Sequence, residues 1–264
     1  MSETKEFPII ELFTSIQGEG IYAGVPSVFV RCSGCNLRCC FKGSICDTPY
    51  SSYFPEKPIH THQDVINQFI SHKVDHLVIT GGEPMLYQEG VIKLINEVDK
   101  VVFKNTGHHV QVTIETNATI LPKDSLLSDE RILWSMSPKL STSEPSAGAN
   151  GVTEQQAIRH KKIRINVDAM IGMLLSRGKS KLKFVYSDEE SFKEIKLLIH
   201  LLQTQIQQLS LPKNVNDSVM LMPEGITNEQ LQRTRLACAN HCIEEGWLYT
   251  DRLHIVIWGD KRGV

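Results

Sequence analysis

The chain has 264 residues, of which 41% are hydrophobic and 22% are charged, as in an ordinary globular protein. This composition excludes a collagen-like, low-complexity or intrinsically disordered chain. The 28 lysines and arginines stand against 30 acidic residues, so the net charge is −2 and no general positive field is present to hold nucleic acid or an anionic membrane. We therefore expect a small-molecule substrate.

The expected location is the cytoplasm. Residues 1–6 show no basic segment followed by an apolar one, and no apolar run approaches the roughly 18 residues of a membrane-spanning helix. Thiols stay reduced in the cytosol, so clustered cysteines there indicate metal binding or catalysis rather than disulfides. No linker rich in Pro, Gly or Ser divides the chain, and we expect one domain over residues 1–264.

Predicted strands and helices alternate along the chain. The strands are expected at residues 27–31, 76–80, 110–116, 132–137, 182–186, 219–222 and 253–258. Apolar residues at helical spacing predict helices near residues 61–70, 91–98, 195–206 and 231–243, the first with Thr61 as its N-cap. Residues 139–151 lack periodicity and predict a mobile loop, and residues 155–181 are too weakly patterned to assign. Six or seven strands alternating with four or five helices predict an α/β fold around a parallel sheet, either open or a partial barrel.

The cysteines are concentrated in one place. Five of the seven fall within fifteen residues: Cys32, Cys35, Cys39, Cys40 and Cys46. Three thiolates on a short loop can bind three irons of a [4Fe–4S] cluster and leave the fourth iron open for a small molecule. A structural zinc site has four ligands, normally supplied by two Cys-x₂₋₄-Cys pairs that are well separated in sequence, and this segment lacks a second such pair. We favour iron–sulfur, with zinc or plain buried thiols as alternatives, and we expect Cys238 and Cys242 to be core residues on a helix.

Several motifs closely resemble those of 7-carboxy-7-deazaguanine synthases, which are radical S-adenosylmethionine (SAM) enzymes of queuosine biosynthesis. At the start of the chain they are residues 12–20 (LFTSIQGEG), 24–31 (GVPSVFVR), 34–39 (GCNLRC) and 46–50 (CDTPY). Further along they are residues 80–84 (TGGEP), 115–117 (ETN), 137–139 (SPK) and 254–259 (HIVIWG). The resemblance therefore spans the whole chain.

The resemblance implies a partial (β/α)6-type TIM barrel of the radical SAM superfamily. It also implies a [4Fe–4S] cluster, SAM and Mg²⁺ as cofactors, an electron donor such as a flavodoxin or ferredoxin, and a homodimer. The implied reaction converts 6-carboxy-5,6,7,8-tetrahydropterin to 7-carboxy-7-deazaguanine with loss of ammonia, started by a 5′-deoxyadenosyl radical. No side chain needs to act as a nucleophile, because the cofactor performs the hard step. The alternatives are a glycyl-radical activase of the same superfamily and a non-enzymatic zinc module.

The cluster ligands implied by the resemblance are Cys35, Cys39 and Cys46. The usual loop is Cys-x₃-Cys-x₂-Cys, whereas six residues separate Cys39 from Cys46, which indicates a four-residue insertion near residues 40–45. Cys39 keeps the first spacing, and the adjacent Cys40 is the alternative middle ligand, with Cys32 a plain thiol. The residue before the last cysteine is usually aromatic and lies near the adenine; it is Ile45 here, unless Phe41 takes its place.

The SAM-binding residues implied by the resemblance end predicted strands or flank the last cysteine. They are Ile45, Cys46, Asp47, Gly82, Glu115, Ser137, Pro138 and Lys139. Ligands of α/β sheets bind at strand ends, which agrees with this placement. A glycine such as Gly82 lets the backbone approach a ligand because it lacks a Cβ. A plain strand-to-helix turn at Gly82 and a solvated carboxylate at Glu115 are the alternatives.

The resemblance also implies a substrate site. Its members are Ile16, Gln17, Gly18, Glu19, Arg31, Thr80 and His254. The fork of Arg31 suits the carboxylate of the pterin, and the amide and carboxylate of Gln17 and Glu19 suit the donor and acceptor edge of its ring. Thr48 is similar to a Mg²⁺ ligand of the family, as a hard oxygen donor.

Overall fold

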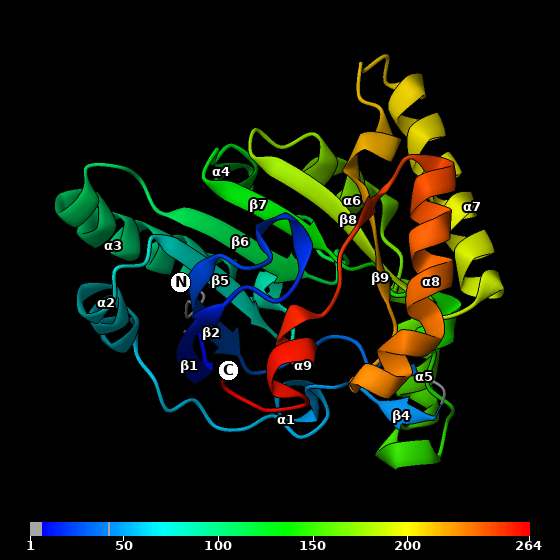
Figure 1. The fold of residues 1–264 in the computed structure, drawn as a ribbon, viewed down its shortest axis with the longest axis horizontal. Helices are drawn as coiled ribbons and strands as arrows, with labels where there is room; N and C mark the ends of the chain where they lie inside the picture. Colours follow the sequence, from blue (N-terminus) through cyan, green and yellow to red (C-terminus); the bar gives the residue numbers. More distant parts are fainter. Residues whose placement is uncertain (1–6, 42) are drawn as a thin grey trace.

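The computed structural model describes residues 7–41 and 43–264, and its strands form one main sheet (Figure 1). In spatial order these strands are β1 (Ile9–Ile16), β2 (Pro26–Cys32), β5 (His76–Gly81), β6 (Gln111–Thr116), β7 (Ile132–Met136), β8 (Lys179–Tyr186), β9 (Val219–Pro223) and β10 (Leu248–Tyr249). Strands β1 and β2 pair antiparallel, and every later pair is parallel. The six strands β2 and β5–β9, with the helices between them, make the partial (β/α)6 barrel that was predicted.

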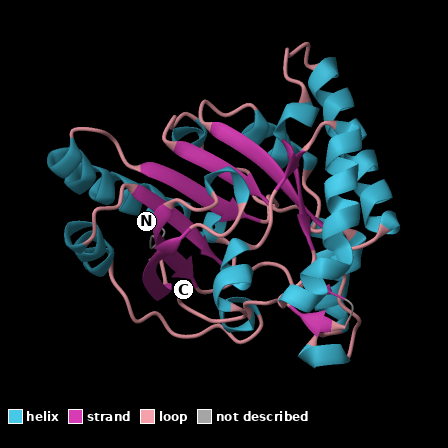
Figure 2. Ribbon diagram, viewed as in Figure 1, coloured by secondary structure: helices cyan, strands magenta, loops and turns pink. Residues whose placement is uncertain are grey.

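Helices pack on the outside of this curved sheet and at one of its ends (Figure 2). They are α1 (Pro49–Ser52), α2 (His62–Ser71), α3 (Gln88–Thr106), α4 (Asp124–Leu127), α5 (Glu154–Ile163), α6 (Val167–Leu174), α7 (Glu189–Gln208), α8 (Asn228–Glu245) and α9 (Leu253–Trp258). Helix α2 begins at a capping box, in which Thr61 and Asp64 bond to each other's backbone N–H, so the predicted N-cap is confirmed. None of the helices within the described residues is long and apolar enough to cross a membrane.

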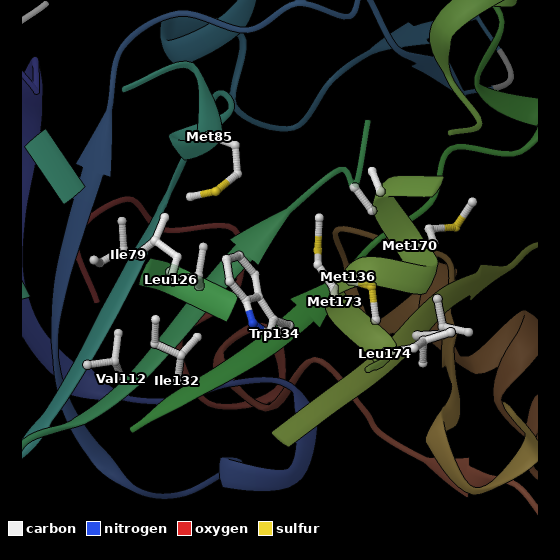
Figure 3. Packing of buried hydrophobic residues seen from close by; sticks show 14 of the residues in the cluster. Ile79, Met85, Val112, Leu126, Ile132, Trp134, Met136, Met170, Met173 and Leu174 are labelled. Carbon is white, nitrogen blue, oxygen red and sulfur yellow. The ribbon is translucent and has the colours of Figure 1, made fainter. Parts of the chain in front are cut away.

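The core lies between the sheet and these helices. Leu77, Val78 and Ile79 are fully buried, so β5 is covered on both faces as parallel strands usually are. Trp134 of β7 is also fully buried and belongs to the cluster of apolar side chains in Figure 3, which includes Val112 of β6. One cluster of buried apolar residues runs from Phe7 to Trp247, and it holds the strand ends in fixed positions around the site.

The strand predicted at residues 253–258 is wrong, because Leu253–Trp258 form the short helix α9. The β-branched run suggested a strand, but Ile255 is its only buried member and Trp258 is 39% exposed. Tertiary contacts decide the conformation: the N–H of Leu253 donates to the carbonyl of Gly18. This contact places α9 over the turn that follows β1.

The other differences are the eight-residue strand β1, which was not among the predicted strands, and several short elements. Strand β10 and a two-stranded hairpin of β3 (Cys40–Phe41) and β4 (Ser44–Ile45) raise the strand count among the described residues above the six or seven expected. Elements of two residues carry no periodicity that a sequence could show. The unassigned residues 155–181 contain most of α5, all of α6 and the start of β8. Lys42 of the predicted insertion and residues 1–6 lie outside the described residues.

The segment at residues 139–151 contains two single-turn 3₁₀ helices, η3 (Ser141–Ser143) and η4 (Ala149–Gly151). Leu140 and Ser143 are buried at its start. Residues 147–151 are exposed, and the mobility of this segment stays a prediction. On α8, Cys238 and Cys242 are both buried, as expected of core residues.

Candidate active site

A cavity of about 770 Å³ opens at the carboxyl ends of the parallel strands. It is lined at the end of β5 by Gly82, at β6 by Glu115, after β7 by Ser137 and after β8 by Ser187. Parallel α/β folds place their ligand contacts at these ends, because the loops that follow the strands converge there. Figure 1 shows α1, the β3–β4 hairpin and α9 gathered at this end of the sheet.

Cys35, Cys39 and Cys46 line this cavity, whereas the buried Cys32 and Cys40 are not among its lining residues. The insertion folds as the β3–β4 hairpin, which returns the chain so that the N–H of Cys46 donates to the carbonyl of Cys39 over 3.0 Å. The hydroxyl of Tyr53 donates to the same carbonyl, also over 3.0 Å. The longer spacing between Cys39 and Cys46 therefore does not separate the two residues.

The surroundings of these thiols suit sulfur ligands of a metal cluster. The side-chain amide of Asn117 and the N–H of Leu37 point to the Sγ of Cys35 from 3.9 and 3.4 Å. Hydrogen bonds to a cysteine sulfur tune an iron–sulfur cluster. Among residues 7–41 and 43–264 no three His, Cys, Asp or Glu side chains lie together as ligands of one metal ion. A four-iron cluster would bind each of the three cysteines at a different iron.

The Gly81-Gly82-Glu83-Pro84 motif packs the end of β5 against the cysteine loop, residues 33–46. A Cβ on Gly82 would lie 1.9 Å from the carbonyl oxygen of Gly34, and the N–H of Glu83 donates to that oxygen over 2.9 Å. The fully buried Glu83 carboxylate accepts hydrogen bonds from the hydroxyl of Thr116 and the N–H of Asn117. Sequence reasoning attributed the missing Cβ of Gly82 to ligand approach, but the backbone of the cysteine loop occupies that space.

Glu115 connects two residues that were assigned to the substrate. Its carboxylate accepts hydrogen bonds from the side-chain amide of Gln17 over 3.2 Å and from the hydroxyl of Thr80 over 2.7 Å. All three residues line the cavity. The predicted SAM and substrate sites therefore share a wall.

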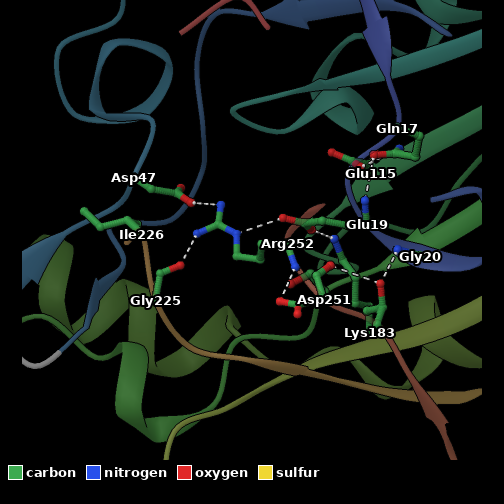
Figure 4. A network of polar contacts seen from close by, with 12 residues as sticks. Gln17, Glu19, Gly20, Asp47, Glu115, Lys183, Gly225, Ile226, Asp251 and Arg252 are labelled. Carbon is green, nitrogen blue, oxygen red and sulfur yellow. Dashed lines mark hydrogen bonds and ion pairs between the residues drawn. The ribbon is translucent and has the colours of Figure 1, made fainter. Parts of the chain in front are cut away.

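A second polar cluster surrounds Glu19 (Figure 4). Its carboxylate pairs with the ammonium of Lys183 on β8 and accepts a hydrogen bond of 3.0 Å from Nε of Arg252. Burial alone would raise the pKa of Glu19, but the charges of Lys183 and Arg252 outweigh burial and lower it, so Glu19 is ionised. Arg252 also donates to the carboxylate of Asp47 over 2.9 Å.

Sequence reasoning missed Lys183 and Arg252. Lys183 is a 7% exposed cation within the apolar strand β8, and that position was the available signal. Arg252 precedes the His254 motif by two residues, and nothing in the sequence indicates its partners.

His254 and Arg31, which were both predicted to bind the substrate, line the cavity. Burial lowers the pKa of His254, which favours the neutral ring, and a Cβ on Gly18 would lie 2.1 Å from its Nδ1. Arg31 donates from Nε to Glu11 over 2.6 Å, so part of its fork is already engaged. The remaining predicted substrate residue, Ile16, lines the cavity as well.

Ser137 and Lys139 line the cavity, and the Lys139 ammonium donates to the Ser137 hydroxyl over 2.8 Å, whereas Pro138 between them is not a lining residue.

Ile45 and Phe41 both line the cavity, so either of the two side chains can lie beside the adenine of SAM. Thr48 lines it too, with its hydroxyl 3.4 Å from the Cys46 sulfur.

Comparisons with known proteins agree with an iron–sulfur enzyme of this fold. A family model described as a 4Fe-4S single cluster domain matches residues 16–158. The 7-carboxy-7-deazaguanine synthase of Halobacterium salinarum is 39% identical over 96% of this chain and 91% of its own length, and that of Rhodopirellula baltica is 36% identical over 97% and 88%. The crystal structure of QueE from Escherichia coli has the same fold, with a TM-score of 0.56 and 21% identity over 94% of this chain and 95% of that one.

A partial (β/α)6 barrel that brings three loop cysteines into a cavity at its strand ends, in a chain matching a 4Fe-4S domain, defines a radical SAM enzyme. The 39% identity to the Halobacterium salinarum enzyme over nearly the whole chain identifies a family, and not only a fold class. The chain belongs to the 7-carboxy-7-deazaguanine synthase family.

Proposed function

We propose that the protein converts 6-carboxy-5,6,7,8-tetrahydropterin to 7-carboxy-7-deazaguanine with loss of ammonia. The observation that carries this proposal is the single cavity lined by Cys35, Cys39 and Cys46 together with the polar side chains of the strand ends. Its 770 Å³ lie within the range of small-molecule sites.

Cys35, Cys39 and Cys46 would hold the cluster, and the lining position of Cys39, which Cys40 does not share, supports this choice of the middle ligand. Asp47, Gly82, Glu115, Ser137 and Lys139, with Ile45, would bind SAM around it. When bound, the cluster and SAM supply an organic radical that removes a hydrogen atom from C6 of the pterin. The cavity walls orient the two molecules and exclude water.

Glu19 and Gln17 would bind the ring of the pterin. The ionised carboxylate of Glu19 is an acceptor for ring N–H groups, and its pairs with Lys183 and Arg252 fix its orientation. Arg31 would bind the substrate carboxylate through its Nη groups, because its Nε already donates to Glu11. The neutral ring of His254 can donate or accept one hydrogen bond.

Three further parts of the proposal rest on the family resemblance. The hydroxyl of Thr48 would bind Mg²⁺ together with water and substrate oxygens, since one hydroxyl cannot make a site alone. A flavodoxin or ferredoxin would supply the electron, and two copies would form a homodimer. We place the protein in the cytoplasm, where the four cysteines outside the proposed cluster would stay reduced.

The test is incubation of anaerobically reconstituted protein with SAM, a reductant, Mg²⁺ and the carboxypterin. We expect 7-carboxy-7-deazaguanine and one ammonia per product molecule. SAM cleavage without this product would keep the enzyme class and reject the substrate. Bound zinc without iron and sulfide in protein purified without air would reject the radical SAM function itself.

A further inference from the structure

Arg252 connects three separate segments of the chain at the cavity (Figure 4). Its Nε donates to Glu19 over 3.0 Å, its Nη2 to Asp47 over 2.9 Å and its Nη1 to the carbonyl of Gly225 over 2.8 Å. The guanidinium group is planar and rigid, so a shift of one acceptor disturbs the bonds to the other two. The side chain is only 13% exposed, which strengthens these bonds relative to a surface pair.

These three acceptors belong to different parts of the site. Glu19 ends the Gln17–Glu19 turn after β1, Asp47 follows the cluster ligand Cys46, and Gly225 lies just beyond β9. Of the two carboxylates, the first is proposed to face the pterin and the second to flank SAM.

The charges around Arg252 indicate what its loss would do. Glu19 would keep its pair with Lys183, so its charge would stay compensated. Asp47 has its ion pair with Arg252, and its side chain is 41% exposed, so it can turn toward water when that pair is lost. Removing Arg252 therefore separates the two segments and leaves the buried Glu19–Lys183 pair in place.

We propose that Arg252 is a positioning residue that couples the binding of SAM to the binding of the carboxypterin, by holding Asp47 and Glu19 in one fixed arrangement. Coupling between two ligands is reciprocal, so each raises the affinity of the other by the same factor. This inference rests on the proposed function, since it takes the Asp47 and Glu19 segments as the SAM and substrate sites.

The test measures this coupling directly, by calorimetric titration of the anaerobic cluster-loaded protein with SAM, in the absence and presence of saturating carboxypterin. In the wild type we expect the carboxypterin to tighten SAM binding by about fivefold or more. In Arg252→Gln the factor falls to about one, while each ligand still binds alone. Arg252→Lys keeps the charge but cannot reach three acceptors, so it loses the coupling as well. Asp47→Ala opens the bridge from its other end, so the coupling factor should also fall to about one, although SAM itself should bind more weakly because Asp47 is a proposed SAM contact; this variant provides a second test if the Arg252 variants fold poorly.

Arg235→Gln is the matched control. Arg235 pairs with Asp251, the neighbour of Arg252, over 2.9 Å, and it is not among the residues lining the cavity. This variant should keep the wild-type coupling. Wild-type coupling in Arg252→Gln or in Arg252→Lys, or its loss in Arg235→Gln, would overturn the proposal. A wild-type protein that binds SAM but neither binds nor converts the carboxypterin would instead overturn the proposed function.

Discussion

Gly18 and His254 are packed so closely that a Cβ on residue 18 would lie 2.1 Å from Nδ1 of His254 and 2.9 Å from its Cγ. The two residues are 236 positions apart in the chain, and the bond from the N–H of Leu253 to the carbonyl of Gly18 fixes the contact. The glycine in the turn after β1 therefore leaves room for the histidine of α9 at the cavity wall.

The substitution Gly18→Ala tests this contact. The added methyl group must push the His254 ring out of its place, so we expect the KM for the carboxypterin to rise roughly tenfold, which corresponds to about 1.4 kcal/mol. Steady-state kinetics measure the change. The double variant Gly18→Ala/His254→Ala is the control: if the ring is what the methyl group meets, the two effects are not additive. Additive effects would show that Gly18 acts elsewhere.

Gly82 and the cysteine loop make a second such contact. Because its Cβ would lie 1.9 Å from the Gly34 carbonyl oxygen and 2.8 Å from that of Ser51, Gly82→Ala must shift the loop that carries Cys35. We expect a loss of about 1–3 kcal/mol in the free energy of unfolding and an iron content well below four per chain after reconstitution. Iron and sulfide analysis with thermal unfolding measures both.

Gly43 in the β3–β4 hairpin provides a control for Gly82. It has a φ of +88°, and among the described residues, its chain neighbours apart, none has an atom within 4 Å of the place of its Cβ. Gly43→Ala therefore introduces only backbone strain, about 1–2 kcal/mol, and the cluster content should stay at the wild-type level. Equal loss of iron in both variants would contradict the role of the Gly82–Gly34 contact.

The two adjacent cysteines should differ in function. Cys39→Ala removes a thiol that lines the cavity, so the reconstituted protein should lose its iron–sulfur absorption and its SAM cleavage. Cys40→Ala and Cys32→Ala remove buried thiols outside the cavity and should keep both, with a modest loss of stability. The assignment of the middle ligand fails if Cys40→Ala loses the cluster and Cys39→Ala retains it.

Much of the barrel could be predicted because its parallel strands are continuous apolar runs, as at Leu77–Ile79, and its long helices have a clear apolar stripe. The helix α9 could not, since the pattern at residues 253–258 is that of a strand and contacts with Gly18 decide the outcome. The local sequence around α9 does not indicate a contact with a residue more than 200 positions away in the chain.

The candidate site could be predicted at the positions that belong to sequence motifs. Among these, Cys35, Cys39 and Cys46 line one cavity together with the Gln17–Glu19 turn. The ionic partners of Glu19 were not predictable, because Lys183 and Arg252 reach it from β8 and from the segment before α9. An isolated charged residue in a sequence does not identify its counter-ion, and only the fold brings the two together.

His76 should make the stability of the protein depend on pH. It is buried at the start of β5, where its Nδ1 lies 2.7 Å from the Ser27 hydroxyl and its Nε2 lies 2.8 Å from the Thr113 hydroxyl. The Ser27 hydroxyl donates to the carbonyl of Val25, so it accepts from Nδ1–H and the ring is neutral with Nε2 accepting from Thr113. Burial lowers the pKa of His76 from 6.5 to about 4.

Between pH 6.5 and pH 4 the unfolded chain therefore binds a proton at His76 that the folded protein does not. The contribution of His76 to stability is complete above about pH 6.5 and is lost as the pH falls toward 4, by about 1.4 kcal/mol for each pH unit in that window. Urea unfolding at pH 7, 5.5 and 4.5 measures the loss, and His76→Asn should show a smaller one. Ser27→Ala removes a hydrogen bond but leaves the ring buried, so it should lower stability at every pH and keep the wild-type slope. An unchanged slope in His76→Asn would show that other groups carry the pH dependence.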